Sequence, residues 1–289
     1  MKVVIPAAGQ GTRFLPATKI QPKEMLPMVD RPIIQYVVEE AVASGADDIL
    51  IVSGRGKRAL EDHFDLNPEL AKWNDRPELR ELDELSRKAR IHFVRQREPK
   101  GLANAIGCAR HHVGSEPFGV LLGDTINVCE PPLLKQLWTR FERHHAPVLA
   151  VEHVPDEKVG DYGIVAGPEI EAGLYRCETL VEKPTLEAAP SRLGITGAYV
   201  LTPDIFSAID RTEPGRNGEV QLTDALQLLA RERPVLAATF EGTRYDIGDL
   251  FLWLRTNVEF GLRTPGLRDR LRPALESLLK KSRETSMKS

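Results

Sequence analysis

The residues best suited to chemistry gather near the start of this 289-residue chain. An apolar strand is expected over residues 2–5, and it runs directly into a turn of small residues, Pro6-Ala7-Ala8-Gly9-Gln10-Gly11-Thr12-Arg13. Such a turn leaves backbone N–H groups uncovered and lets the main chain approach a ligand closely. Arg13 adds a planar fork of donors, and Lys23 adds a compact, mobile positive charge. These residue types in this order indicate a phosphate-binding site.

The turn differs from the two commoner phosphate loops. A dinucleotide-binding turn needs a third glycine where this chain has Phe14, and a Walker loop needs a Gly-Lys-Ser/Thr run that is absent here. Two glycines after a strand are ordinary in turns, so the glycines alone identify nothing. The more specific signal is the joint occurrence of three short motifs: Gly9-x-Gly11-Thr12-Arg13, Leu15-Pro16-x-Thr18 and Pro22-Lys23-Glu24.

This run resembles the signature loop of the sugar-1-phosphate nucleotidylyltransferases. Its continuation over residues 26–38 is most similar to the bacterial-type UTP–glucose-1-phosphate uridylyltransferases. The resemblance implies an α/β fold: a Rossmann-like, mostly parallel mixed sheet flanked by helices, with a small β-rich sugar-binding portion. It also implies a single in-line displacement that depends on Mg²⁺. A phosphate oxygen of glucose-1-phosphate attacks the α-phosphorus of UTP, giving UDP-glucose and pyrophosphate.

The resemblance places the nucleotide on the first loop and on a later passage from strand to helix. In the family, a glutamine at the strand end and a glycine at the helix start read the pyrimidine edge, which implies roles for Gln96 and the Gly101 backbone N–H. An amide side chain offers a donor and an acceptor together, as an imide edge requires. The implied nucleotide-binding residues are Ala7, Ala8, Gly9, Gly11, Thr12, Arg13, Gln96, Gly101 and Gly123.

A carboxylate follows the apolar strand expected over residues 118–122. Open α/β sheets place their chemistry at the carboxyl ends of such strands, and Mg²⁺ is usually held by one or two carboxylates. Asp124 is therefore the first candidate metal ligand. The family frequently has Gly-Asp-Asp here, whereas this chain has Thr125 in the last position. The late Asp-x-Gly motif implies Asp246 as a second ligand, and the implied catalytic residues are Arg13, Lys23, Asp124 and Lys183.

The sugar phosphate is expected on the following, β-rich part of the chain. An exposed Glu-Lys pair is ordinarily a simple surface pair. Here the pair is part of a Glu-Lys-Pro motif downstream of Tyr-Gly, as in the family. In the family the acid binds sugar hydroxyls and the lysine binds the sugar phosphate. The implied sugar-phosphate residues are Tyr162, Gly163, Glu182, Lys183 and Gly197.

The hydrophobic pattern predicts elements that can position these residues. A helix over 33–42, a strand over 48–52 and a helix over 58–64 continue the first strand as a β-loop-α-β-α unit, which argues for a parallel sheet with helices on both faces. Leucines at three-residue spacing predict an amphipathic surface helix within 68–90. We expect one domain over 1–262, with a nucleotide half (about 1–150) and a sugar half (about 151–262). A helical tail over 263–289 is expected to fray from Ser282 onward.

Composition limits the possible partners and location. The formal net charge of −3 gives no support to a nucleic-acid partner. Three widely spaced cysteines favour free thiols in a reducing compartment. The histidine pairs at 111–112 and 144–145 are expected at surfaces or helix ends, because adjacent helical residues point apart. With no signal peptide and no apolar run of membrane-spanning length, we expect a cytoplasmic protein with no membrane partner. By resemblance it forms a dimer or tetramer.

Two alternatives remain open at this stage. A thymidylyltransferase would use dTTP in place of UTP, because a single methyl group in a pocket discriminates weakly. A catalytically silent subunit that senses nucleotide-sugars is the alternative from another class, since one fold can host several functions. The lysines, the arginine and Asp124 argue against the silent subunit, and only Thr125 supports it.

Overall fold

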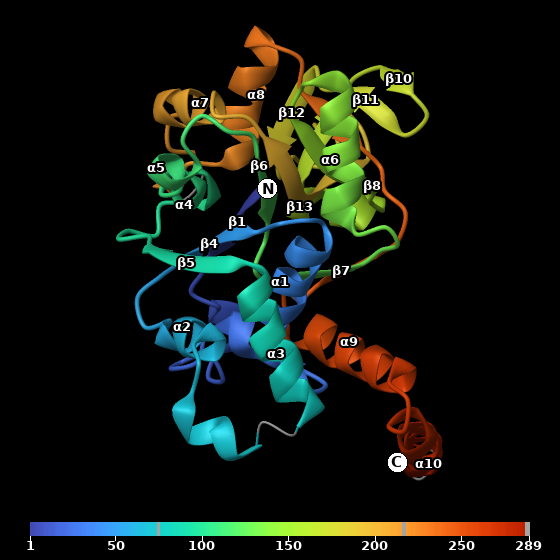
Figure 1. Ribbon diagram of the computed structural model, residues 1–289. Helices are drawn as coiled ribbons and strands as arrows, with labels where there is room; N and C mark the ends of the chain where they lie inside the picture. The colour runs from blue at the N-terminus through green and yellow to red at the C-terminus, as the bar shows by residue number, and fades with distance from the viewer. Residues whose placement is uncertain (74–75, 216–217, 287–289) are drawn as a thin grey trace.

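The computed structural model describes residues 1–73, 76–215 and 218–286. Its centre is an eleven-stranded mixed sheet with helices on both faces (Figure 1). The main path through the sheet runs β10-β11-β14-β8-β13-β6-β1-β4-β5, while β9 pairs with β12 and β13. The expected α/β fold is confirmed.

The parallel part of the sheet carries the first loop. Here β1 lies between β4 and β6, and β5 pairs with β4, all in parallel. The carboxyl ends of these strands therefore meet at one edge, where the loop after β1 and the segment after β6 come together. The bounds are β1 (Lys2–Ala7), β4 (Asp48–Ser53), β5 (Arg90–Arg95) and β6 (Phe118–Leu121).

The long strand β13 joins this part to the later, β-rich part. All nine residues of β13 (Leu193–Leu201) are buried, and the strand pairs antiparallel with β6, β8 and β9. The sheet is therefore continuous from the first loop to the Glu-Lys-Pro motif. The other strands are β8 (Val148–His153), β9 (Gly163–Ala166), β10 (Glu169–Glu171), β11 (Leu174–Arg176), β12 (Thr179–Glu182) and β14 (Leu236–Ala238).

Two hydrophobic cores cover the two faces of the sheet. Side chains of β4 alternate between them, with Leu50 in one core and Ile51 in the other, as the strand period of two requires. The first core includes α4 (Leu102–Gly107), α5 (Arg110–Val113), α7 (Ile205–Arg211) and α8 (Leu222–Glu232). The second includes α1 (Ile33–Ala43), α2 (Arg58–Phe64), α3 (Pro77–Lys88) and α6 (Leu133–His144).

The surface helix expected within 68–90 is confirmed as α3 (Pro77–Lys88), which contains the evenly spaced leucines Leu79, Leu82 and Leu85. A 3₁₀ turn, η3 (Pro68–Trp73), precedes α3, and residues 74–75 lie outside the described chain. Pro77 occupies the start of α3. The first N–H groups of a helix have no partner within it, so proline, which lacks an N–H, sacrifices no hydrogen bond there. Three more 3₁₀ turns are η1 (Thr12–Phe14), η2 (Lys23–Met25) and η4 (Asp156–Asp161).

A two-stranded ribbon and the last helices complete the molecule. The ribbon pairs β7 (Thr125–Val128) with β15 (Thr243–Asp246). Asp249 caps α9 (Leu250–Arg263) as expected, because its side chain accepts a hydrogen bond from the Leu252 N–H at 2.8 Å. Then α10 (Arg268–Ser286) extends away from the sheet (Figure 1), and it continues to Ser286, beyond the point where fraying was expected. None of the helices in the described ranges combines the length and apolar character that a bilayer span requires.

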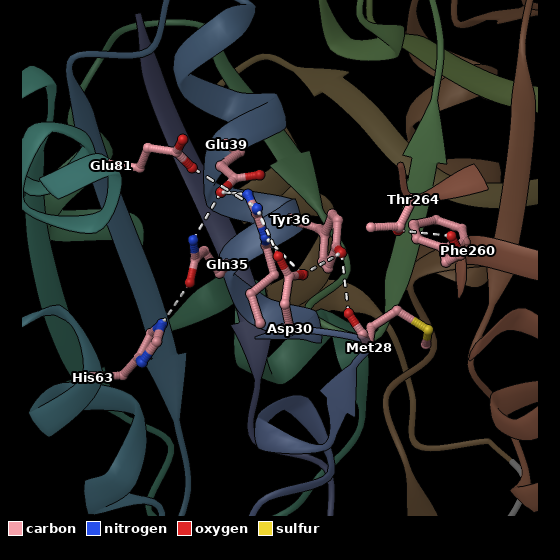
Figure 2. Close-up of polar contacts among 10 residues, drawn as sticks. Met28, Asp30, Gln35, Tyr36, Glu39, His63, Glu81, Phe260 and Thr264 are labelled. Atoms are coloured by element: carbon pink, nitrogen blue, oxygen red, sulfur yellow. Dashed lines mark hydrogen bonds and ion pairs between the residues drawn. The ribbon is translucent and has the colours of Figure 1, made fainter. Parts of the chain in front are cut away.

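Polar contacts around α1 fix the hairpin of β2 (Pro27–Met28) and β3 (Arg31–Pro32), which directly follows the Lys23 turn (Figure 2). Gln35 donates to Glu39 at 2.9 Å and accepts from His63 at 3.1 Å. Burial lowers the pKa of His63 to about 4, so the ring is neutral near pH 7. The Tyr36 hydroxyl donates to the Met28 carbonyl at 3.1 Å. The residues after the basic turn are thereby tied to α1, and α1 is tied to α2.

Candidate active site

The loop after β1 folds back onto the Lys23 turn. Gly11 has φ +66°, a left-handed conformation that glycine adopts without strain. Its carbonyl accepts from the Thr18 hydroxyl at 2.7 Å, and a Cβ placed on it would lie 3.2 Å from the Lys23 Cβ. Phe14 is buried below the loop in a small hydrophobic core that is separate from the two large ones. The sequence therefore places small residues where two segments approach closely.

Lys23 and Asp124 form an ion pair at the carboxyl edge of the sheet. The two side chains are partly buried, with 21% and 23% exposure. Burial alone would lower the pKa of Lys23, but the charges of Asp124 and Glu24 outweigh it and hold this pKa above its ordinary value. Lys23 is therefore fully protonated near neutral pH, as a phosphate-binding group must be.

A second, fully buried ion pair lies behind the first. Lys57 donates to both carboxylate oxygens of Glu24, at 2.8 and 2.7 Å. Burial raises the pKa of Glu24 and lowers the pKa of Lys57, because both charged forms lose water, and their mutual attraction opposes these shifts. Since Glu24 follows Lys23 directly, this pair anchors the turn that presents Lys23.

Asp124 and Asp246 come together through the β7–β15 ribbon. In the ladder Asp246 lies opposite Thr125, and the Ile247 N–H donates to the Asp124 carbonyl at 3.1 Å. Burial raises the pKa of Asp246, and the negative charge of Asp124 adds to this, while the charge of Arg244 opposes it. Thr125 itself is buried in the ribbon. The second carboxylate near Asp124 is therefore supplied across the ribbon and not by the next residue in sequence.

Gln96 and Gly101, both expected to bind the nucleotide, lie side by side. Gln96 is 7% exposed, and its Nε2 donates to the Gly101 carbonyl at 3.2 Å and to the Asn104 side chain at 2.8 Å. Both contacts use the amide nitrogen, so the side-chain oxygen takes no part in them and can accept a hydrogen bond from another group. Gly101 has φ +94°, and a Cβ there would come within 2.7 Å of the Val220 carbonyl. The chain before α8 therefore packs directly against this strand-to-helix passage.

The residues expected on the sugar side also gather in one place. Lys183 has φ +44°, rare for a residue other than glycine, and its N–H donates to the Tyr162 carbonyl at 3.0 Å. Glu182 accepts from the Thr223 hydroxyl at 2.6 Å. A Cβ on Gly163 would lie 2.6 Å from that hydroxyl, so the space left by this glycine is filled by the Thr223–Glu182 contact. Thr223 thus connects α8 to the Glu-Lys-Pro motif.

Arg244 is a site residue that the sequence motifs do not include. Its side chain is 7% exposed, and its guanidinium forms an ion pair with Glu152. The guanidinium also donates to the Tyr162 hydroxyl at 2.9 Å and lies over that ring at 5.2 Å. It is also 3.6 Å from Asp246 Oδ2. Arg244 therefore connects a candidate metal ligand to the sugar side. The only local signal is its position two residues before Asp246.

Two cavities lie next to each other at Asp124, which lines both of them. One, of about 490 Å³, is lined by residues that include Ala8, Gly9, Thr12, Lys23, Gln96 and Gly101. The other, of about 200 Å³, is lined by residues that include Tyr162, Gly163, Glu182, Lys183, Gly197 and Asp246. Asp124, Leu102 and Leu122 line both. The expected nucleotide and sugar residues thus face adjoining spaces.

A few expected residues lie elsewhere. Arg13 lines a third cavity, of about 550 Å³, together with Lys183 and Asp246, and donates to the Gly248 carbonyl at 3.4 Å. It does not line the cavity that holds Gly9 and Gln96. Ala7, Gly11 and Gly123 line none of the three cavities. Ala7 is buried, and a Cβ on Gly123 would lie 3.1 Å from the Pro6 carbonyl, so these two residues pack the base of the loop.

The parallel sheet, the glycine turn and two carboxylates flanked by lysines define a class of enzymes that bring a nucleotide and a second phosphorylated ligand together. The chain belongs to the nucleotidyl transferase family, which it matches over residues 2–258. The resemblance stated from the first loop is confirmed.

Relatives within this family cover nearly the whole chain. The UTP–glucose-1-phosphate uridylyltransferase of Bacillus subtilis is 49% identical over 284 residues, 97% of each chain. The Streptococcus pneumoniae protein of the same name is 47% identical and covers 98% of this chain and 97% of its own. A UDP-glucose pyrophosphorylase complexed with UDP-glucose superposes with a TM-score of 0.86 at 41% identity, over 91% of this chain and 99% of that one. A UTP-bound UGPase from Acinetobacter baumannii gives 0.85 at 36% identity, over 96% and 99%.

Proposed function

We propose that this chain transfers the uridylyl group of UTP to glucose-1-phosphate and releases UDP-glucose and pyrophosphate, a step of nucleotide-sugar biosynthesis. The observation that carries the proposal is the pair of adjoining cavities with Asp124 in both walls. One cavity has the residues expected for a pyrimidine nucleotide, and the other those expected for a sugar phosphate. Full-length relatives named for this reaction support the choice of substrates.

The chemistry needs charge compensation more than proton transfer. The attacking phosphate oxygen is anionic near neutral pH, so it forms its bond to the α-phosphorus without a general base. The bond between the α-phosphorus and the bridging oxygen breaks, and its electron pair leaves with pyrophosphate. Two polyanions must meet in line, so fixed cations supply both positioning and stabilisation. We assign Lys23 to the triphosphate and Lys183 to the sugar phosphate. Arg13 is assigned to the triphosphate on its motif alone, although it lines the neighbouring cavity with Lys183 and Asp246.

Asp124 and Asp246 suit a magnesium ion. Carboxylate oxygens are the hard ligands that Mg²⁺ prefers, and the two groups are brought together by the β7–β15 ribbon. When bound there, the ion would supply positive charge to the phosphate oxygens. Lys23 pairs with Asp124 and also lines the nucleotide cavity, so its ammonium can exchange the carboxylate for a phosphate.

The alternatives have less support. A putative glucose-1-phosphate thymidylyltransferase from Bacillus anthracis shares the fold at a TM-score of 0.72, but at 22% identity it bears on the fold alone. The one feature that favours a silent sensing subunit is Thr125 after Asp124, and Asp246 supplies a second carboxylate across the ribbon. The lysines and both aspartates of the site are present and gathered, which argues against a silent subunit.

Pyrophosphate release with Mg²⁺ and glucose-1-phosphate, measured across UTP, dTTP, CTP, ATP and GTP, tests the proposal. We expect a strong preference for UTP. Equal or better use of dTTP would assign the chain to thymidylyl transfer. Folded protein that is silent with every nucleotide and several sugar phosphates would favour the sensing subunit.

We propose a homodimer or homotetramer, supported by exposed apolar side chains on the last two helices: Leu250, Phe251, Leu254, Leu278 and Leu279. We propose a cytoplasmic location, supported by three cysteines that are all free thiols. The division into one domain over 1–262 and a tail stays a prediction.

A further inference from the structure

Three potential metal ligands converge at the edge of the sheet opposite the catalytic edge. Asp48 is the first residue of β4, whereas the loop of the active site follows the last residue of the neighbouring β1. His112 Nε2 lies 2.7 Å, and His92 Nε2 3.7 Å, from the same oxygen of Asp48, Oδ1. One ligand atom from each of the three residues lies within 4.8 Å of the other two.

The fold explains why these side chains meet. Asp48 and Leu50 point to the same face of the sheet because they are two residues apart, and His92 is the register partner of Leu50 on β5. Leu50 packs in the core that α4 and α5 cover, so Asp48 and His92 project toward α5, which carries His112. The two imidazole rings lie 5.0 Å apart.

The segment that carries His112 is held in place by a separate set of contacts. The Lys2 ammonium donates to the carbonyls of His112 and Val113, at 3.1 and 3.2 Å, and pairs with Glu116 at 2.7 Å. His112 is therefore anchored through its backbone, and its ring stays available to Asp48. On the other side, Arg90 approaches the second oxygen of Asp48 at 4.0 Å, and its exposed side chain leaves Oδ1 facing the histidines.

We propose that Asp48, His92 and His112 form a binding site for a divalent transition-metal ion such as Zn²⁺. Two imidazoles and one carboxylate, with a water in the fourth position, are a recurrent tetrahedral ligand set. Ligand atoms in such a site lie about 3.3 Å apart, given metal–ligand bonds of about 2.0 Å. The two distances to Asp48 Oδ1, 2.7 Å from His112 and 3.7 Å from His92, lie on either side of this spacing. The His92 side chain is 48% exposed, so it can turn and shorten the longer distance. The ligand chemistry separates this site from the active site, whose carboxylates suit Mg²⁺.

Calorimetric titration of the full-length, tag-free chain with Zn²⁺ tests the proposal. Excess Mg²⁺ is present throughout, so that carboxylate-only sites are occupied. We expect one equivalent to bind. His92→Gln and His112→Gln should each weaken binding by at least about tenfold, the smallest loss usual even for residues that only support a metal ligand. The matched control is His111→Gln, which removes an adjacent, exposed imidazole outside the cluster.

A second measurement identifies the ligands independently of activity. With Co²⁺ as the probe, a tetrahedral nitrogen and oxygen site gives intense visible absorption, whereas an octahedral carboxylate site absorbs weakly. We expect the intense band in the unmodified chain and in His111→Gln, and its loss in His112→Gln and in Asp48→Asn, with circular dichroism confirming that each variant is folded. The proposal is overturned if the unmodified chain binds no Zn²⁺ under these conditions. It is also overturned if both histidine variants retain full affinity, or if His111→Gln loses as much.

Discussion

Replacing Arg244 by methionine should change how the enzyme's activity depends on pH. Arg244 is the positive charge nearest the Asp246 carboxylate on the sugar side, at 3.6 Å. Burial already raises the pKa of Asp246, and the charge of Arg244 opposes that rise. Without the guanidinium this pKa rises further. A carboxyl group must be ionised to hold a cation, so Asp246 would become competent only at higher pH.

The size of the shift follows from the geometry. Two unit charges 3.6 Å apart interact by about 1 kcal/mol in bulk water and by about 4–5 kcal/mol at an effective dielectric constant of 20. The Asp246 side chain is 37% exposed, so water screens the pair and the lower half of this range applies. About 1.5–3 kcal/mol corresponds to a rise of roughly one to two pKa units.

The assay is the pH profile of kcat/KM at fixed Mg²⁺, together with the Mg²⁺ concentration for half-maximal activity at each pH. For Arg244→Met the acid limb should move up by about one to two pH units. The Mg²⁺ requirement should be raised at low pH and approach that of the unmodified chain at high pH. Arg244→Lys, which keeps the charge without the planar fork, should recover part of the shift.

A surface variant controls for general loss of positive charge. Arg176→Gln removes a half-exposed arginine at the end of β11 whose partner is Glu178, at 2.9 Å in the short segment before β12. Its profile should coincide with that of the unmodified chain. If Arg244→Met is folded and its acid limb does not move, then Arg244 does not set the ionisation of Asp246 and the reasoning is wrong.

Further predictions concern the three lysines of the site. Lys23→Ala should reduce kcat by on the order of 10²-fold or more, because it removes a fixed charge from the triphosphate; intact turnover with altered stability alone would refute that role. Lys183→Ala should raise KM for glucose-1-phosphate more than KM for UTP, and unchanged kcat and KM would remove Lys183 from the site. Lys57→Met leaves the Glu24 carboxylate buried and unpaired, so urea unfolding should show a loss of about 3–5 kcal/mol. A Glu24→Leu, Lys57→Met double variant should recover most of this lost stability. If Lys57→Met alone were as stable as the unmodified chain, the Glu24–Lys57 ion pair would not be stabilising the fold.

At the catalytic edge, the sequence predicts those residues whose role depends on local structure. Asp124 comes shortly after the apolar run Phe118–Leu121, and this alone places it near the carboxyl end of a strand. Gly101 begins a helix after a strand, and its φ of +94° explains why glycine is needed there. The first loop likewise depends on residues that are close in sequence. In each case the information lies within a few residues of the site.

Other parts of the site depend on contacts between distant segments. Arg244 reaches Glu152 and Tyr162 across 92 and 82 positions, and no motif marks it. Lys57 is an ordinary loop lysine until the fold places it against Glu24. His112 was expected at a helix end, where the structure has it, but its approach to Asp48 depends on how α5 packs on the sheet. Sequence periodicity cannot reveal such pairings.

The β7–β15 ribbon also bears on how this enzyme can evolve. Ladder hydrogen bonds between main-chain atoms hold Asp246 beside Asp124, so the side chain at position 125 can change without moving either carboxylate. An aspartate at 125 would face Asp246 directly across the ladder, where like charges repel, whereas threonine introduces no charge there. Natural descent should therefore tolerate more variation at position 125 than at 124 or 246. The acid that this chain lacks beside Asp124 is one that the ribbon makes dispensable.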